Sequence, residues 1–322
     1  MKNLQVVVSG STGLIGQALC KRLRANGHVV RTMQRQSSGQ NESSSAASVA
    51  QPTSSEQIQW DPAHGLLDPQ QLNGVDCVFH LAGRSIAAAR WTAAEKKRIR
   101  NSRVQATQRL VEQLCKLASP PKTFISASAI GIYGDRGDQL VDESTPAADS
   151  FLADVVSDWE AACLPLVEAG VRVVHPRLGM VLSPAGGGLS QMLPIFRWRL
   201  AGRLGSGKQY WSWIALPDVI SALEWMMCEP SAAGSYNVVA EAITNAEFTK
   251  TLADALGVSA LVPAPAWGMR LALGEMADAL LLCSCRVVPQ RLTAAGFTMQ
   301  HPELAPFLAD GITGTPAGLP IA

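Results

Sequence analysis

Charged side chains are scarce in this sequence, and their signs almost cancel. Lys, Arg, Asp and Glu make up 16% of the 322 residues, and the net charge is +1. Neither a basic surface for nucleic acid nor a polybasic run for anionic lipid is therefore expected. Hydrophobic residues, at 47%, instead predict a compact globular body.

Long uninterrupted hydrophobic runs are also missing. The best candidate, residues 267–285, is broken by Arg270, Glu275 and Asp278, which argues against a membrane-spanning helix. A strand-like run begins directly after the first three residues, so no signal peptide is expected there. We expect a protein without a membrane partner.

Cysteine is present, but it is not arranged as a disulfide or metal framework. The seven cysteines are an odd number and are scattered, apart from Cys283 and Cys285. One Cys-x-Cys pair without a second cluster is a poor metal site, and no metal is expected. The pattern is typical of reduced thiols packed as small apolar groups in a cytoplasmic protein.

What the sequence does contain, close to its start, is a glycine-rich turn between an apolar run and a helix-like pattern. Residues 6–19 read VVVSGSTGLIGQAL. Gly10 permits a tight turn, Gly13 lets the backbone approach a pyrophosphate, and Gly16 lets the helix pack close to the sheet. The phosphates would then meet free N–H groups at the positive end of the helix dipole. The residues expected to bind this dinucleotide are Gly10, Ser11, Thr12, Gly13, Leu14, Ile15 and Gly16.

Strand-like and helix-like segments alternate through the first half of the chain. The apolar runs expected to be strands are residues 4–9, 28–33, 77–81, 123–128 and 171–175. This alternation predicts an α/β fold with a doubly wound parallel sheet of the Rossmann type. After Arg177 the chain becomes rich in glycine and tryptophan, which predicts a smaller C-terminal substrate lobe over the sheet.

The predicted domains are discontinuous. Residues 1–177, joined by a returning segment at 215–257, are expected to form an NADP(H)-binding Rossmann domain. Residues 178–214 and 258–310 are expected to form the substrate lobe. Residues 37–57 are rich in Ser, Ala and Gln and almost free of large apolar side chains, which predicts a mobile surface loop.

No acidic residue follows the second strand, where NAD-binding proteins usually place one for the ribose hydroxyls. Arg35, or less favourably Arg31, occupies this place and is suited to hold a 2′-phosphate through its guanidinium. The sequence therefore favours NADP(H) as the cofactor. An ordinary solvated arginine is the alternative for Arg35.

Further cofactor contacts are expected at the ends of other strands. Leu81, Ala82 and Gly83 follow an apolar run, where small residues let the backbone pass the adenosine ribose. Asp61 is expected near the adenine, although an Asp-Pro turn gives the same sequence. Arg177 ends a strand and is expected to contact the cofactor or the substrate.

The basic stretch after residue 83 leaves two interpretations open. Arg90, Trp91 and Arg103 either face the cleft and hold an anionic or planar substrate group, or belong to a solvated helix face. Arg103 is also counted among the residues expected to line the cofactor site.

Several segments together resemble a known family. They are GSTGLIG, FHLAG, RWTAAEKKRIRNSR, ISASAIGIYGDRGD, FLADVVSDWEAA, RLGMVLSPAGG, LGSGKQYWSWI and LGEMADALLL. From about residue 4 to about residue 307 the chain resembles the atypical, extended short-chain dehydrogenase/reductases of the NAD-dependent epimerase/dehydratase family. The resemblance implies a Rossmann domain, a C-terminal substrate lobe and a preference for NADP(H). Some members of this family are called sugar-nucleotide epimerases.

The catalytic pattern of that family is incomplete in this sequence. Its epimerases and dehydratases use a Tyr-x-x-x-Lys pair with an upstream serine, in which tyrosine moves the proton and lysine lowers its pKa. Ser126 and Ser128 stand in the place of the serine, followed by Tyr133. Residues 151–162, where the pair is expected, contain neither tyrosine nor lysine. Ser126, Ser128 and Tyr133 are therefore the candidates for the catalytic positions.

Three interpretations follow from the missing pair. A substitute acid or base acts, for which the candidates are Asp154, Asp158, Glu160, Tyr133 and Lys208. Alternatively the protein catalyses a narrow reduction in which water supplies the proton, or it binds NADP(H) without turnover. The sequence favours a cytoplasmic NADP(H)-binding oxidoreductase or epimerase acting on a small polar substrate, with a homodimer as a further possibility. The alternative is a non-catalytic NADP(H)-responsive binding or regulatory protein.

Overall fold

The structure of the protein is a computed structural model that describes residues 3–35, 56–62 and 66–313. The predicted loop at 37–57 lies outside these residues, apart from its last two positions. Within the described part of the chain, no helix combines the length and apolar character that crossing a bilayer requires.

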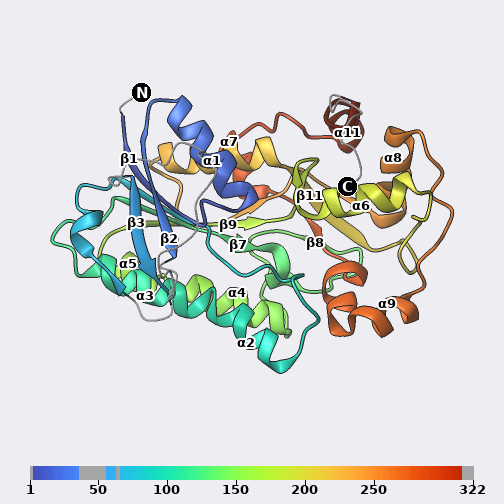
Figure 1. Ribbon diagram of the computed structural model, residues 1–322, viewed down its shortest axis with the longest axis horizontal. Coiled ribbons are helices and arrows are strands. Elements are labelled where there is room, and N and C mark those ends of the chain that lie inside the picture. Colours follow the sequence, from blue (N-terminus) through green and yellow to red (C-terminus); the bar gives the residue numbers. More distant parts are fainter. Residues whose placement is uncertain (1–2, 36–55, 63–65, 314–322) are drawn as a thin grey trace, which may run out of the picture.

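A mainly parallel sheet occupies the middle of one half of the molecule, with helices on both faces (Figure 1). The strand order is β12-β9-β6-β5-β1-β2-β3-β4, and β7 pairs with β9. All of these pairs are parallel except β3 with β4. This arrangement confirms the predicted doubly wound fold. The strands are β1 (Gln5–Ser9), β2 (Val29–Arg35), β3 (Gln57–Asp61), β4 (Leu66–Leu67), β5 (Cys77–His80), β6 (Thr123–Ser126), β7 (Ser128–Ala129), β9 (Arg172–Leu178) and β12 (Gly234–Val238).

The central strands are continuous apolar runs because helices cover both faces. Val6, Val7 and Val8 of β1 have no exposed surface, as expected for a strand buried on both sides. α1 (Leu14–Ala25) and α7 (Leu216–Cys228) cover one face. α3 (Val104–Cys115) and α5 (Leu164–Glu168) cover the other, with α4 (Phe151–Ala161) beside α3 (Figure 1).

A second, smaller unit lies at the other end of the molecule (Figure 1). Its sheet has the order β10-β11-β13. Aromatic side chains fill its core, where Trp211 packs on Phe248 and Trp213 stacks on Phe307. The elements are β10 (Met180–Ser183), β11 (Tyr210–Ala215), β13 (Glu241–Thr244), α6 (Gly187–Arg197), α8 (Asn245–Leu256) and α11 (Leu304–Thr313).

The returning segment 215–257 divides between the two units. α7 and β12 join the large sheet, whereas β13 pairs with β11 and α8 packs against α11 and α6. The expected placement of residues 241–257 in the Rossmann domain is therefore corrected. An amphipathic helix must bury one face, but its sequence does not say which sheet covers that face.

The remaining elements connect the two units. β8 (Leu140–Val141) pairs with β14 (Arg286–Val287), and Lys96 of one unit forms an ion pair with Glu275 of the other. Where β9 passes into β10, a Cβ on Gly179 would come within 2.7 Å of both Ser212 O and Val239 Cγ1. Only glycine fits at this crossing. The other elements are α2 (Ala93–Asn101), α9 (Ala266–Leu273), α10 (Gln290–Ala294), the 3-10 turns η1 (Pro69–Leu72) and η2 (Ile130–Tyr133), and the π-helical turn η3 (Ala277–Leu282).

Candidate functional site

The glycine-rich turn between β1 and α1 has the shape that a dinucleotide pyrophosphate requires. Gly10 has a φ of +71°, and a Cβ on it would lie 2.7 Å from the Leu81 carbonyl carbon. A Cβ on Gly16 would lie 2.2 Å from Gly10 O, so these two glycines are needed for packing. Gly13 differs, because its Cβ would meet only Gly10 O, at 3.4 Å. The exposed Gly13 therefore leaves a surface open to a ligand.

No acceptor from a side chain of the described residues occupies the N-terminus of α1. Gly13 is its N-cap residue, no side chain caps it, and its first turn carries no acidic residue. Free N–H groups at such an end bind phosphate well. Leu14 lies against Gly186 and Gly187 of the smaller unit, which brings that unit over the turn. This cradle fits the pyrophosphate of a dinucleotide.

A buried histidine holds the turn of residues 81–83, which lies beside the glycine-rich loop. His80 ends β5, and its ring bonds Ser9 Oγ at 2.7 Å and Thr107 Oγ1 at 3.0 Å. Burial lowers the pKa of His80 to about 4, so the ring is neutral at physiological pH. His80 thereby ties the ends of β1 and β5 to α3. The turn of Leu81, Ala82 and Gly83 is held beside the glycine-rich loop as a result.

On the other side of β1 lie the strands expected to meet the adenosine half of a cofactor. Arg35 ends β2 and Asp61 ends β3, the next strand outward. The side chain of Arg35 lies outside the described part of the structure. The guanidinium of Arg31, the less favoured alternative, donates to Gln71 O, and its buried Nε has no hydrogen-bond partner in the described structure. Asp61 belongs to the antiparallel pair of β3 and β4.

Arg103 precedes α3 and lies where β5 and β6 end. Its guanidinium carbon would be 3.4 Å from a Cβ on Gly83 and lies 5.3 Å from the centre of the Trp159 ring. By contrast, Trp91 is buried against Phe151 and donates to Ile86 O. Arg90 lies against Gly274. Of the three residues weighed as substrate ligands, only Arg103 adjoins the cofactor turn.

Two of the three candidate catalytic residues, Ser128 and Tyr133, belong to a buried polar network, whereas the Oγ of Ser126 has no hydrogen-bond partner in the described structure. Ser126 is fully buried, and Ser128, 3% exposed, donates to Glu160 Oε1 at 2.5 Å. Arg177 binds the same carboxylate through Nε and Nη2, both at 2.8 Å. Burial raises the pKa of Glu160, but hydrogen bonding and charge from Arg177 outweigh it, so the net pKa is below its usual value. Glu160 is therefore ionised.

Tyr133 occupies the centre of this network. It has no exposed surface, and its hydroxyl accepts from Arg177 Nη1 and donates to Asn237 Oδ1, both at 2.8 Å. Burial raises the pKa of Tyr133, and Arg177 and Asn237 oppose that effect only in part. A phenol enclosed in this way does not reach a substrate. We interpret Tyr133 as a residue that positions Arg177, not as a proton donor.

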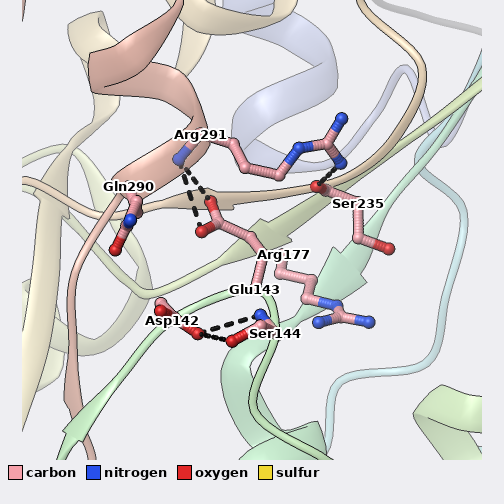
Figure 2. Close-up of a pocket in the computed structure, with 7 residues that line it drawn as sticks. All are labelled: Asp142, Glu143, Ser144, Arg177, Ser235, Gln290 and Arg291. Atoms are coloured by element: carbon pink, nitrogen blue, oxygen red, sulfur yellow. Dashed lines mark hydrogen bonds between the residues drawn. The ribbon is translucent and has the colours of Figure 1, made fainter.

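A polar pocket of about 440 Å³ opens beside this network, at the β12 edge of the sheet (Figure 2). Its charged side chains already have partners, and those of Glu143 and Arg291 are backbone groups. Glu143 accepts from the backbone N–H groups of Asn237 and Arg291, and Arg291 donates to Ser235 O. This pocket is separated from β1 by three strands, so it is not the dinucleotide cradle. Its lining residues are Asp142, Glu143, Ser144, Arg177, Ser235, Gln290 and Arg291.

Asn237 and Glu143 were not predicted from the sequence. Asn237 lies 104 residues from Tyr133 and 94 from Glu143 along the chain, so no local pattern announces either contact. Among the described residues, no group of three or more His, Cys, Asp or Glu side chains is arranged to hold a metal ion.

The chain is similar to known proteins over nearly its whole length. The model of the NAD dependent epimerase/dehydratase family matches residues 6–239, and that of a domain of unknown function matches residues 264–310. An epimerase family protein of Mycobacterium bovis is 40% identical over 94% of this chain and 95% of its own. The crystal structure of the human epimerase family protein SDR39U1 with NADPH matches with a TM-score of 0.83 and 31% identity, over 97% of this chain and 100% of that one. A nucleoside-diphosphate sugar epimerase of Corynebacterium glutamicum matches with a TM-score of 0.77 and 30% identity, over 97% of this chain and 58% of that one.

Proposed function

Because the chain belongs to the NAD-dependent epimerase/dehydratase family, we propose that it is an NADP(H)-dependent oxidoreductase or epimerase-like enzyme acting on a small polar substrate. The observation that carries this proposal is the cradle at Gly13, open to a ligand at the uncapped end of α1. The human relative with 31% identity was crystallised with NADPH, which supports NADP(H) as the cofactor. Arg35 at the end of β2 is the candidate ligand of the 2′-phosphate.

The nicotinamide would accept or supply a hydride, and this chain's own residues would orient the substrate. Cofactors of this kind cross the ends of the central strands, and Ser128 would then lie beside the reacting end. A hydroxyl that donates to a carboxylate still has lone pairs free to accept a hydrogen bond. Ser128, held by Glu160, would thus orient a substrate hydroxyl. With its low pKa, Glu160 serves as an acceptor in this arrangement and not as an acid.

The cofactor assignment is tested by calorimetric titration with NADPH and NADH. We expect the wild-type protein to prefer NADPH, and Arg35→Ala to weaken NADPH far more than NADH. Arg197→Ala, which removes an exposed arginine of α6, is the control for the same change in net charge. Equal losses for both cofactors in Arg35→Ala would remove the 2′-phosphate assignment.

The alternative, a non-catalytic NADP(H)-responsive protein, is favoured by two observations. Tyr133 is enclosed, and the predicted Tyr-Lys segment in α4 has neither residue. Oxidation of bound NADPH by a panel of carbonyl compounds and nucleotide sugars would establish the enzyme. Because epimerisation regenerates its cofactor, the nucleotide sugars are also analysed for epimeric products. A cytoplasmic location and a homodimer stay predictions.

A further inference from the structure

Arg103 is a half-buried cation without an anionic partner in the described residues. It forms no ion pair there, and its guanidinium makes one long hydrogen bond, 3.4 Å from Nη1 to Ile99 O. The neighbouring arginines differ, because Arg98 pairs with Glu95 and Arg100 pairs with Asp158. The guanidinium of Arg103 therefore has most of its five N–H donors available.

Partial burial of such a group is unfavourable unless an anion offsets it. Burial lowers the pKa of Arg103 to about 10, and no neighbouring charge opposes that shift. The group nevertheless stays charged at neutral pH. Contact with the Trp159 ring compensates only in part, since a cation–π contact contributes about 0.5–2 kcal/mol. A partly buried cation without a counter-charge is characteristic of a site that binds an anion.

A second donor nearby also lacks a partner. Trp159 is 5% exposed, and its Nε1 has no hydrogen-bond partner in the described structure. Trp159 packs with Val104 and Ala127, in the gap between α3, α4 and the end of β6. Two unsatisfied donor groups are thus held in one place, against the turn at Gly83.

The order of the strands indicates whether the anion that Arg103 would bind belongs to the cofactor or to the substrate. The pyrophosphate cradle follows β1, and the candidate 2′-phosphate ligand Arg35 follows β2. Arg103 lies on the opposite side of β1, at the ends of β5 and β6. A dinucleotide extended across the sheet from the cradle would direct its nicotinamide half toward Arg103, and that half carries no further phosphate.

We propose that Arg103 binds a carboxylate or phosphate of the substrate, so that the substrate of this protein is a small anion. The inference rests on the proposed function, since it takes the nicotinamide half to lie beside β6. The anion neutralises the guanidinium and fixes the substrate next to Ser128. Both cofactor and substrate then meet at the ends of β5 and β6.

The test uses inorganic phosphate as the probe and four proteins: wild type, Arg103→Met, Arg103→Lys and Arg197→Met. Met retains the apolar stem of Arg103 without its charge. Arg197, an exposed arginine of α6, is the control for the same change in net charge. Phosphate binding is measured by calorimetry on the NADPH-loaded proteins at constant ionic strength, so that the pyrophosphate cradle is already filled. Melting temperatures are measured without phosphate.

We expect Arg103→Met to reduce phosphate affinity at least about tenfold, as loss of a charged hydrogen-bond donor implies. Arg103→Lys should recover part of the affinity, and Arg197→Met should bind as the wild type does. Without phosphate, Arg103→Met should melt at or above the wild-type temperature, because a poorly compensated charge has been removed.

Three results would overturn the proposal. Equal phosphate affinity in the wild type and Arg103→Met would show that no site exists there. A lower melting temperature of Arg103→Met without phosphate would make Arg103 a structural partner of Trp159. A loss of NADPH affinity in Arg103→Met, together with no phosphate binding by the loaded wild type, would assign the anion to the cofactor. If the wild type binds no NADPH at all, the proposed function fails, and the same comparison on unloaded protein still tests the anion site.

Discussion

Arg177 and Glu160 form a bidentate ion pair, in which Nε donates to Oε1 and Nη2 donates to Oε2, each at 2.8 Å. Their side chains are only 10% and 14% exposed. The pair joins β9 to α4 and provides the partners of Ser128 and Tyr133. The stability of the fold and the order of the candidate site therefore depend on the same two residues.

Glu160→Gln should destabilise the protein by about 3–5 kcal/mol, because it leaves the buried Arg177 charge without its counter-charge. Glu275→Gln is the matched control. Glu275 is 49% exposed in its pair with Lys96, and such pairs contribute about 0–1 kcal/mol. Urea unfolding of both variants measures the difference. Similar losses in the two variants would contradict the role given to the buried pair.

Tyr133→Phe should lower the free energy of unfolding by about 1–3 kcal/mol, because Arg177 and Asn237 each lose a buried hydrogen-bond partner. NADPH affinity should stay unchanged. Denaturant unfolding and cofactor titration are the measurements. Unchanged stability combined with complete loss of turnover would restore Tyr133 as a catalytic residue.

Gly13→Ala and Gly16→Ala should separate ligand binding from folding. A Cβ at residue 13 has room in the protein but projects into the open cradle, so we expect a folded protein with weakened NADPH binding. A Cβ at residue 16 collides with backbone at 2.2 Å, so Gly16→Ala should be strongly destabilised. Thermal unfolding and calorimetry test both. A stable Gly13→Ala that binds NADPH normally would show that the cofactor does not approach Gly13.

The stability of the protein should decline in acid because of His80. Its pKa is about 4 in the folded protein and 6.5 ordinarily, so between these values the unfolded chain binds a proton that the folded one does not. This contribution is complete above about pH 6.5 and is lost as the pH falls toward 4, for a total of about 3 kcal/mol. We expect the free energy of unfolding, measured in urea at each pH, to change less steeply with pH between 4 and 6.5 for His80→Gln than for the wild type. Identical slopes would mean that His80 is not held neutral.

The parts of the site that could be predicted from the sequence are those formed by residues close together along the chain. The glycine-rich turn could be interpreted because a strand, a turn and a helix follow one another within residues 6–19. Each of the three glycines is required by a different part of that short segment. The family and the parallel sheet were predicted from motifs and alternation along the chain, and both are confirmed.

The parts that sequence did not predict depend on contacts between distant residues. Tyr133 lies directly after the serine motif, but Asn237 and Arg177 enclose it, and neither is near it in sequence. The lack of a partner for Arg103 is likewise invisible in the sequence, because Glu95 and Asp158 could pair with any of the arginines between residues 84 and 103. Only the folded arrangement gives them to Arg84, Arg98 and Arg100.

The close crossing at Gly179 limits how the two units can move. The chain passes between them there, again from β11 into α7, and again from β12 into β13. Because the chain crosses several times, neither unit is a contiguous piece that could be expressed alone. Residues 264–310, for example, would lack all three strands of the smaller sheet. Since the packing at Gly179 leaves no space for even a Cβ between the units, we expect selectivity to depend on the shape and charge of the site as the fold forms it.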